Sequence, residues 1–319
     1  MDRRHTGAHV EHFERHGWVL MERLLNDVEI DAALPGLFQL YPTPEQFHAG
    51  ADPRVARFRS GSKAPENQGE DRRFRPLQFA GLQEFPFADL ALNLLPLHPA
   101  IIAVAEDLLR TRDVRLYQAE TFAKYTGVTQ YDQPFHADYT NHVMLPPSAD
   151  GGWRQIQLFL YLSNVTAAHG PTRIVSRTLT DDLPVLALSF PRARAPAERH
   201  AAWEAAATSA VGPRGSLLAY SADVVHRGTE MTLEGGGRFF FNLAYRAAGA
   251  DWVGGNPWPR KGISPGWTPL VEALGVRQLE ALGFPSPGHD YWDAATLAGA
   301  AQRYPKLDLA PWRAALRSA

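Results

Sequence analysis

Apolar and polar positions alternate most clearly in the segment Gln155–Leu162. Four aliphatic side chains fall on one face of an extended chain, and two glutamines, Phe159 and Tyr161 fall on the other. Because the second face is polar and aromatic rather than charged, we expect it to line a cavity. Similar patterns predict further strands at Trp18–Glu22, Val114–Thr121, Phe122–Tyr125, Ser216–Tyr220, Val224–His226 and Arg238–Tyr245.

Helical patterns flank these strands on both sides. Pro35 is expected to kink or interrupt the second helix, because proline has no N–H to donate. Residues 42–80 are rich in Pro, Gly and charge without a steady period, and we predict a long loop or flap there. The expected helices span residues 8–16, 26–40, 87–95, 99–110, 195–210, 270–282, 294–303 and 311–317.

The order of these elements predicts one domain over residues 1–319. A helical part covers residues 1–112, a β-rich core covers about 113–250, and a helical, loop-rich tail covers 251–319. Hydrophobic residues make up 45% of the chain, which permits a core of normal size.

Composition excludes several classes of function. The chain has no cysteine, so it holds no disulfide, Cys-ligated zinc or iron–sulfur cluster and uses no thiol catalysis. The formal net charge of −2 gives no basic field for nucleic acid or an acidic membrane. Neither an apolar signal core nor a membrane-spanning run is evident, and we expect a cytoplasmic protein, monomeric or homodimeric, that acts on a small molecule.

Two separated segments carry the ligands of a metal site. His136 and Asp138 are two residues apart, so on an extended segment both side chains point to the same side. His226 follows an apolar strand ninety residues later. Two histidines and one carboxylate leave three positions open on an octahedral iron, the arrangement of non-heme Fe(II) oxygenases. We therefore predict that these three residues are the metal ligands and catalytic centre.

A cationic residue follows at the right distance for an anionic cosubstrate. Arg238 opens an apolar strand twelve residues after His226. Its guanidinium group can bind a carboxylate through two parallel hydrogen bonds, so it is the candidate anchor for the far carboxylate of 2-oxoglutarate. Thr229 lies between His226 and Arg238 and is a candidate to contact the cosubstrate through its hydroxyl group.

The sequence resembles the phytanoyl-CoA dioxygenase family of Fe(II)/2-oxoglutarate-dependent oxygenases. The resemblance is carried by FHADY at residues 135–139, HGPTRIVS at 169–176 and the run at 215–228 that ends in HRG. Arg238 and the opening FERHGWVL at 13–20 add to it. It implies a double-stranded β-helix, also called a jelly-roll or cupin-like fold. It also implies Fe(II), 2-oxoglutarate and O2 as cofactors, with ascorbate as a candidate reductant.

The same resemblance suggests further contacts to the cosubstrate. In this superfamily, residues on the strand before the His-x-Asp motif help to hold the keto acid, which points to Gln118 and Lys124. Thr172 lies in the Gly-Pro-Thr segment and is a third candidate. Because Asp138 keeps the carboxylate that related halogenases replace, the resemblance favours hydroxylation over halogenation.

Candidate substrate contacts are aromatic or lie close to the motif. They are Tyr139, His142, Trp153, Phe159 and Tyr161. Asp223, three residues before His226, either orients that histidine or belongs to a turn.

The expected activity is hydroxylation of an aliphatic C–H bond with release of succinate and CO2. The substrate class stays open among an acyl-CoA, an amino-acid derivative and a natural product. Two alternatives remain: a cupin-like metal-dependent isomerase or hydrolase, which would need neither Arg238 nor 2-oxoglutarate, and a non-enzymatic jelly-roll binding protein.

Overall fold

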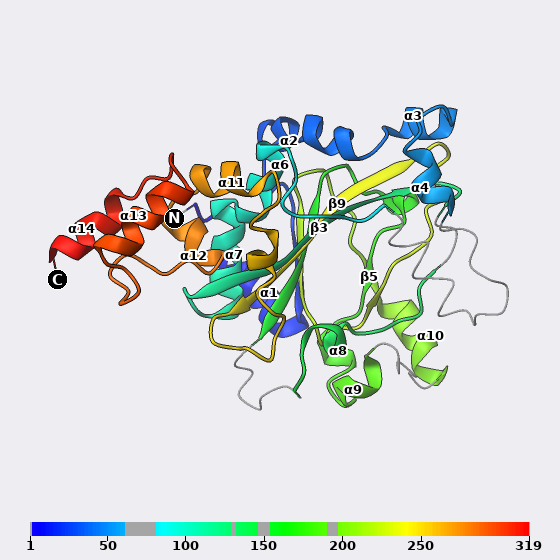
Figure 1. Cartoon of the computed structure of the whole chain (residues 1–319). Helices are drawn as coiled ribbons and strands as arrows, with labels where there is room; N and C mark the ends of the chain where they lie inside the picture. The colour runs from blue at the N-terminus through cyan, green and yellow to red at the C-terminus, as the bar shows by residue number, and fades with distance from the viewer. Residues whose placement is uncertain (1, 61–80, 129–131, 146–153, 190–196, 319) are drawn as a thin grey trace.

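Two antiparallel sheets form the centre of the protein (Figure 1). The computed structural model describes residues 2–60, 81–128, 132–145, 154–189 and 197–318. The large sheet has the order β1-β7-β4-β9-β3-β2, and the small sheet has the order β6-β5-β8. The strands are β1 (Trp18–Met21), β2 (Gln83–Glu84), β3 (Val114–Tyr125), β4 (Gln155–Tyr161), β5 (Arg173–Ile174), β6 (Thr208–Ser209), β7 (Leu217–Ser221), β8 (His226–Arg227) and β9 (Gly237–Ala247).

Strand β4 has the two faces that its alternating sequence predicts. Ile156, Leu158 and Leu160 are fully buried in the main hydrophobic core. Gln157 and Phe159 point the other way and line a cavity between the sheets. Paired strands, a second small sheet and flanking helices give the mainly β, double-stranded β-helix fold that we expected.

Two details of the predicted strands are wrong. The segments predicted as separate strands before and after residue 121 form one continuous strand, β3, and its register with β9 shifts between Leu116 and Gln118. This bulge changes which side chains face the cavity, because one extra residue reverses the alternation. In addition, β8 begins at His226 instead of ending there.

The N-terminal helices cover the outer face of the large sheet and one end of it. They are α1 (Gly7–His16), α2 (Asp27–Leu40), α3 (Pro44–Ala49), α4 (Val55–Ser60), α6 (Leu90–Leu94), the 3-10 helix η1 (Leu95–Leu97) and α7 (Pro99–Leu109). Helix α2 runs without interruption through Pro35, so the predicted break is wrong. The predicted 42–80 loop is also partly wrong, since α3 and α4 lie in it; residues 61–80 fall outside the described residues.

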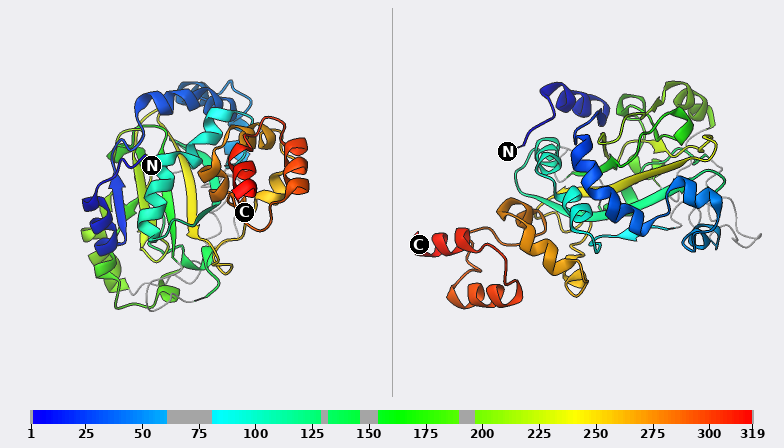
Figure 2. Two further views of the ribbon diagram at one scale, coloured as in Figure 1. Left: turned by 90° about the vertical axis from the view of Figure 1, so that its left-hand side faces the viewer. Right: turned by 90° about the horizontal axis from the view of Figure 1, so that it is seen from above.

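Short helices and turns complete the chain. Between the sheets' strands lie α8 (Tyr139–His142), η2 (Ala167–His169), η3 (Arg177–Leu179), α9 (Val185–Leu188) and α10 (Ala197–Ala206). The tail forms η4 (Trp258–Lys261), α11 (Trp267–Ala273), α12 (Val276–Ala281), α13 (Ala294–Arg303) and α14 (Ala310–Ser318). Figures 1 and 2 show that α13 and α14 extend away from the sheets on the side of α7 and α12.

One helical stretch in the described chain, Leu90–Leu109, is long and apolar enough by composition to cross a membrane. Most of it is buried inside the molecule, and α7 packs against β3, β4 and β9. This environment is that of a core helix.

Candidate metal and cosubstrate site

The three predicted metal ligands lie together in the wall of the cavity beside the large sheet. His136 and His226 exchange two backbone hydrogen bonds, with N···O distances of 3.0 and 2.9 Å, which fix the two segments side by side. Asp138 follows on the same segment just before α8. One ligand atom from each of the three residues lies within 4.8 Å of the others, so the group can hold a metal ion.

Hydrogen bonds orient both imidazole rings toward a common point. The Nδ1 atom of His136 lies 2.8 Å from the carbonyl oxygen of Pro134, and Nδ1 of His226 lies 3.1 Å from that of Val224. A carbonyl oxygen accepts a hydrogen bond only from Nδ1–H, so in the neutral form of each ring Nε2 carries the free lone pair. The Nε2 atoms lie 3.6 and 3.4 Å from the carboxylate of Asp138.

The electrostatic environment of the three candidate ligands favours binding of a cation. Burial lowers the pKa of His136 to about 4, so its ring is neutral at neutral pH. Burial alone would raise the pKa of Asp138, but the His226 and His136 rings outweigh it and hold that pKa well below its usual range. A charged carboxylate beside an available imidazole lone pair is the donor set that Fe(II) oxygenases use.

A tyrosine that we did not predict supports the carboxylate. The hydroxyl of Tyr220, on β7, donates to Oδ2 of Asp138 at 3.3 Å. The Tyr220 ring also lies against His226, with centroids 4.7 Å apart. We infer that Tyr220 fixes the orientation of the Asp138 carboxylate. The signal in the sequence was its position two residues after Leu218, on the same face of β7 and opposite to that of Leu217 and Ala219.

Tyr220→Phe is expected to weaken metal binding about 10-fold, because hydrogen bonds to metal ligands contribute affinity in the range of 10–100-fold. Titration of the apoprotein with Mn(II) measures this constant. Tyr245→Phe is the matched control, since its hydroxyl donates to the carbonyl of Pro96 far from the site. Equal metal affinity in Tyr220→Phe and wild type would contradict the role of Tyr220.

Two buried cations lie together at one end of the same face. Lys124 on β3 and Arg238 on β9 are direct cross-strand partners, and each side chain is 4% exposed. Burial and the neighbouring Arg238 lower the pKa of Lys124, and burial lowers the pKa of Arg238 to about 10. Arg238 donates to the carbonyl of Gly170 and packs over Phe240, but its Nε has no hydrogen-bond partner.

No carboxylate of the described residues forms an ion pair with either Lys124 or Arg238. Burial of two cations side by side is costly and lowers the pKa of both, and a bound anion would remove part of that cost. The pair therefore forms a strong site for a carboxylate or another small anion.

A cavity of about 600 Å³ joins the ligand group to the cation pair. Among the predicted contacts, the cavity wall includes all three metal ligands, Arg238, Gln118, Lys124, Thr172, His142 and Phe159. Tyr161 lies behind Arg238 in a small adjoining pocket, and its hydroxyl donates to the carbonyl of Ala210. His142 makes a 3.1 Å contact with the hydroxyl of Tyr117.

Other predicted residues lie elsewhere. The hydroxyl of Thr229 donates to the carbonyl of Pro171, and that of Tyr139 donates to the carbonyl of Leu145; neither residue lines the cavity. Trp153 lies outside the described residues. Asp223 does not touch His226, because its carboxylate is paired with Arg177 at 3.1 Å; it therefore belongs to the turn.

The structure adds cavity residues that we did not single out from sequence. The signal was again alternation, along β3 and β9, once the bulge after Leu116 is taken into account. These residues include Tyr117, Glu120, Phe122, Phe240 and Asn242, whereas Gln157 on β4 lies on the face that its sequence predicted.

Comparison with known structures supports the fold. The non-heme alpha ketoglutarate dependent epimerase SnoN from nogalamycin biosynthesis is 15% identical, with a TM-score of 0.51 over 76% of this chain and 82% of that one. The non-heme alpha ketoglutarate dependent carbocyclase SnoK from the same biosynthesis is 17% identical, with a TM-score of 0.52 over 82% of this chain and 92% of that one. No curated protein matches the sequence significantly.

The family model of phytanoyl-CoA dioxygenase (PhyH) matches residues 13–234, more than two thirds of the chain. This range contains the three metal ligands and ends just before Arg238. The chain therefore belongs to the phytanoyl-CoA dioxygenase family and is a 2-oxoglutarate-dependent oxygenase.

Proposed function

We propose that this enzyme hydroxylates an aliphatic C–H bond of a small-molecule metabolite while it converts 2-oxoglutarate to succinate and CO2. The observation that supports this most strongly is one cavity with a His-Asp-His ligand group and, on the same face, a buried pair of cations. An isomerase or hydrolase with the same three ligands would gain nothing from the two buried charges.

In this proposal His136, Asp138 and His226 hold Fe(II). When bound, the metal supplies the activation of O2, for which 2-oxoglutarate provides electrons. The protein's part is to offer two imidazole nitrogens and one carboxylate oxygen in fixed positions and to leave the remaining positions open.

Arg238 and Lys124 bind the far carboxylate of 2-oxoglutarate. The guanidinium group is held in place by the carbonyl of Gly170 and by the face of Phe240, 5.0 Å from its centroid. Because both cations are already buried, little solvent has to be removed from them when the carboxylate arrives. Gln118 and Thr172 remain candidate contacts in the cavity wall.

Aromatic side chains line the cavity beside the cation pair. Phe122 and Phe240 have ring centroids 4.1 Å apart, and Phe159 lies 5.1 Å from Phe240. These rings exclude water around the bound keto acid, which strengthens its interaction with the two charges.

Lys124→Met is expected to raise the dissociation constant of 2-oxoglutarate about 10-fold. One charge-assisted hydrogen bond contributes about 1.5–3 kcal/mol, and Arg238 remains to hold the carboxylate. Calorimetric titration of the metal-loaded protein measures the constant. Lys306→Met, an exposed change in the tail, is the control and should leave it unchanged; an unchanged constant in Lys124→Met as well would remove Lys124 from the site.

Formation of succinate tests the proposed function directly. Metal-stripped protein is supplied with Fe(II), O2 and 2-oxoglutarate, and succinate is measured with and without each component. Succinate formation that requires all three is the expected result. Binding of metal without any binding or turnover of 2-oxoglutarate would contradict the proposal.

We also propose, from sequence alone, a cytoplasmic location and a monomeric or homodimeric state.

A further inference from the structure

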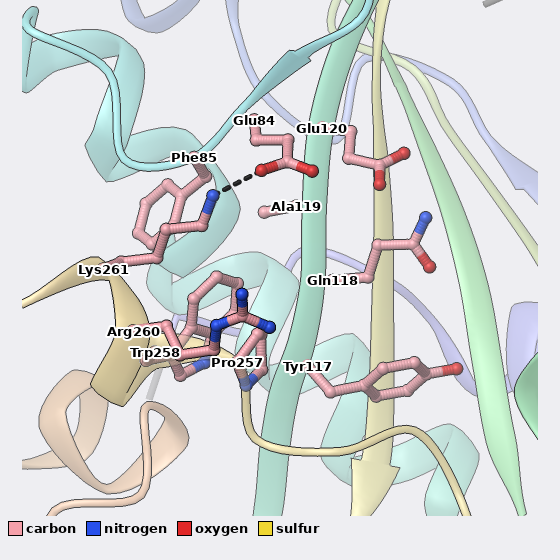
Figure 3. A pocket seen from close by; sticks show the side chains of 10 residues that line it. All are labelled: Glu84, Phe85, Tyr117, Gln118, Ala119, Glu120, Pro257, Trp258, Arg260 and Lys261. Atoms are coloured by element: carbon pink, nitrogen blue, oxygen red, sulfur yellow. Dashed lines mark hydrogen bonds and ion pairs between the residues drawn. The ribbon is translucent and has the colours of Figure 1, made fainter. Parts of the chain in front are cut away.

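A second pocket adjoins the catalytic cavity across the edge of the large sheet. It has a volume of about 390 Å³ and lies where β2 ends and η4 covers the edge of β3 (Figure 3). Tyr117, Gln118 and Glu120 line both this pocket and the catalytic cavity. The two spaces therefore meet at these three side chains, and the larger one also contains the metal ligands.

The carboxylate of Glu120 stands at the boundary between the two spaces. Its cross-strand neighbour on β2 is Glu84, a like charge directly opposite, which is an unfavourable pairing in a sheet. Lys261 pairs with Glu84, as the dashed line in Figure 3 shows, and no cation in the described parts of the chain forms an ion pair with Glu120. Burial raises the pKa of Glu120, and the nearby charge of Glu84 adds to this, against a smaller opposite effect of the hydrogen bond with Gln118.

A second acceptor faces the same point from the other neighbouring strand. Asn242 on β9 is the direct cross-strand partner of Glu120 and also lines the catalytic cavity. Its Oδ1 atom is buried and has no hydrogen-bond partner. A buried acceptor without a donor costs about 1–3 kcal/mol, and a ligand that donates hydrogen bonds removes that cost.

Charge is therefore divided along the cavity. Lys124 and Arg238 make one end cationic, while Glu120 lies four cross-strand pairs away along β3 and β9 and makes the other end acidic. A keto acid is directed to the first end and repelled from the second. A positively charged group has the opposite preference, so the two ligands would take separate places in one cavity.

We propose that Glu120 and Asn242 bind a protonated amine of the prime substrate, with the carboxylate and the amide oxygen accepting its N–H groups. This proposal rests on the proposed function, because the amine would belong to the molecule that is hydroxylated. It selects among the open substrate classes: a basic amino compound fits this end of the cavity, and an anionic acyl-CoA thioester does not. Arg260 and Lys261 line the outer part of the second pocket; Lys261 is neutralised by Glu84.

Three probes of equal size and different charge test the proposal. Cyclohexylmethylammonium, cyclohexylmethanol and cyclohexanecarboxylate are titrated calorimetrically into the full-length protein loaded with Mn(II) and 2-oxoglutarate. We expect the ammonium to bind at least 10-fold more tightly than the alcohol, and the carboxylate to bind most weakly. In Glu120→Gln the preference for the ammonium over the alcohol should disappear, and in Asn242→Leu it should fall by about 3-fold.

Glu234→Gln is the matched control, because it removes the same charge from an exposed position outside both pockets, and it should keep the full preference. Affinity for 2-oxoglutarate is measured on every variant, so that loss of the cosubstrate site is seen separately from loss of the amine site. Retention of the preference in Glu120→Gln would overturn the proposal, as would equal binding, or no saturable binding, of the three probes by a wild type that binds 2-oxoglutarate.

Discussion

Asp138→Ala is expected to reduce succinate formation by more than about 100-fold. Removing even a hydrogen-bond partner of a ligand typically costs 10–100-fold in metal affinity or activity, and here a ligand itself is removed. The change also leaves His136 and His226 without the only negative charge that the ligand group contains. Turnover at saturating 2-oxoglutarate, with metal content measured on the same samples, gives the effect.

Asp223→Ala is the control for that experiment. Its carboxylate is also close in sequence to His226, but it is paired with Arg177 and does not reach the ligand group. We expect near wild-type turnover from Asp223→Ala. Comparable losses in the two variants would mean that charge in this region, and not ligation by Asp138, supports the activity.

Arg238→Leu is expected to raise the dissociation constant of 2-oxoglutarate by about 100-fold or more. Removing one partner of a buried charge pair costs about 2–5 kcal/mol, and each 1.4 kcal/mol is a factor of ten. The loss should be confined to ligands with a far carboxylate, because that group alone is expected to contact Arg238. Calorimetric titration with 2-oxoglutarate and with 2-oxobutyrate, which lacks the far carboxylate, distinguishes loss of this contact from a general loss of keto-acid binding.

Arg246→Leu is the matched control on the same strand. Arg246 is also buried, at 7% exposure, but it donates to the backbone carbonyl groups of Ala247 and Ala250 and does not line the cavity. We expect lower stability from Arg246→Leu and an unchanged constant for 2-oxoglutarate. A similar loss of affinity for 2-oxobutyrate and 2-oxoglutarate in Arg238→Leu would show damage to the fold in place of a lost contact.

Local patterns predicted much of the fold, because they record which side of an element is buried. Alternation in β4 separated a core face from a cavity face, and helical patterns placed α1 and α2. The long loop over 42–80 failed in part because Pro44 is favourable in the first turn of α3, although proline elsewhere breaks helices.

The site was less accessible from sequence, since it depends on register between distant strands. The His-x-Asp motif and the distal histidine could be found by ligand type and spacing. The pairing of Lys124 with Arg238 could not, because a bulge after Leu116 sets the register of β3 against β9. Thr229 shows the reverse case: its position between His226 and Arg238 was suggestive, but a nearby backbone carbonyl uses its hydroxyl.

The adjacency of Lys124 and Arg238 affects how stable the protein is with and without its cosubstrate. Two like charges held out of water strain the empty enzyme, and a bound dicarboxylate relieves that strain only in the folded state. Ligand that binds the folded form stabilises it by RT ln(1 + [L]/Kd), about 2.7 kcal/mol at a hundredfold excess over Kd. The supply of a central metabolite would thus govern how much of this enzyme survives proteolysis, in addition to how fast it works.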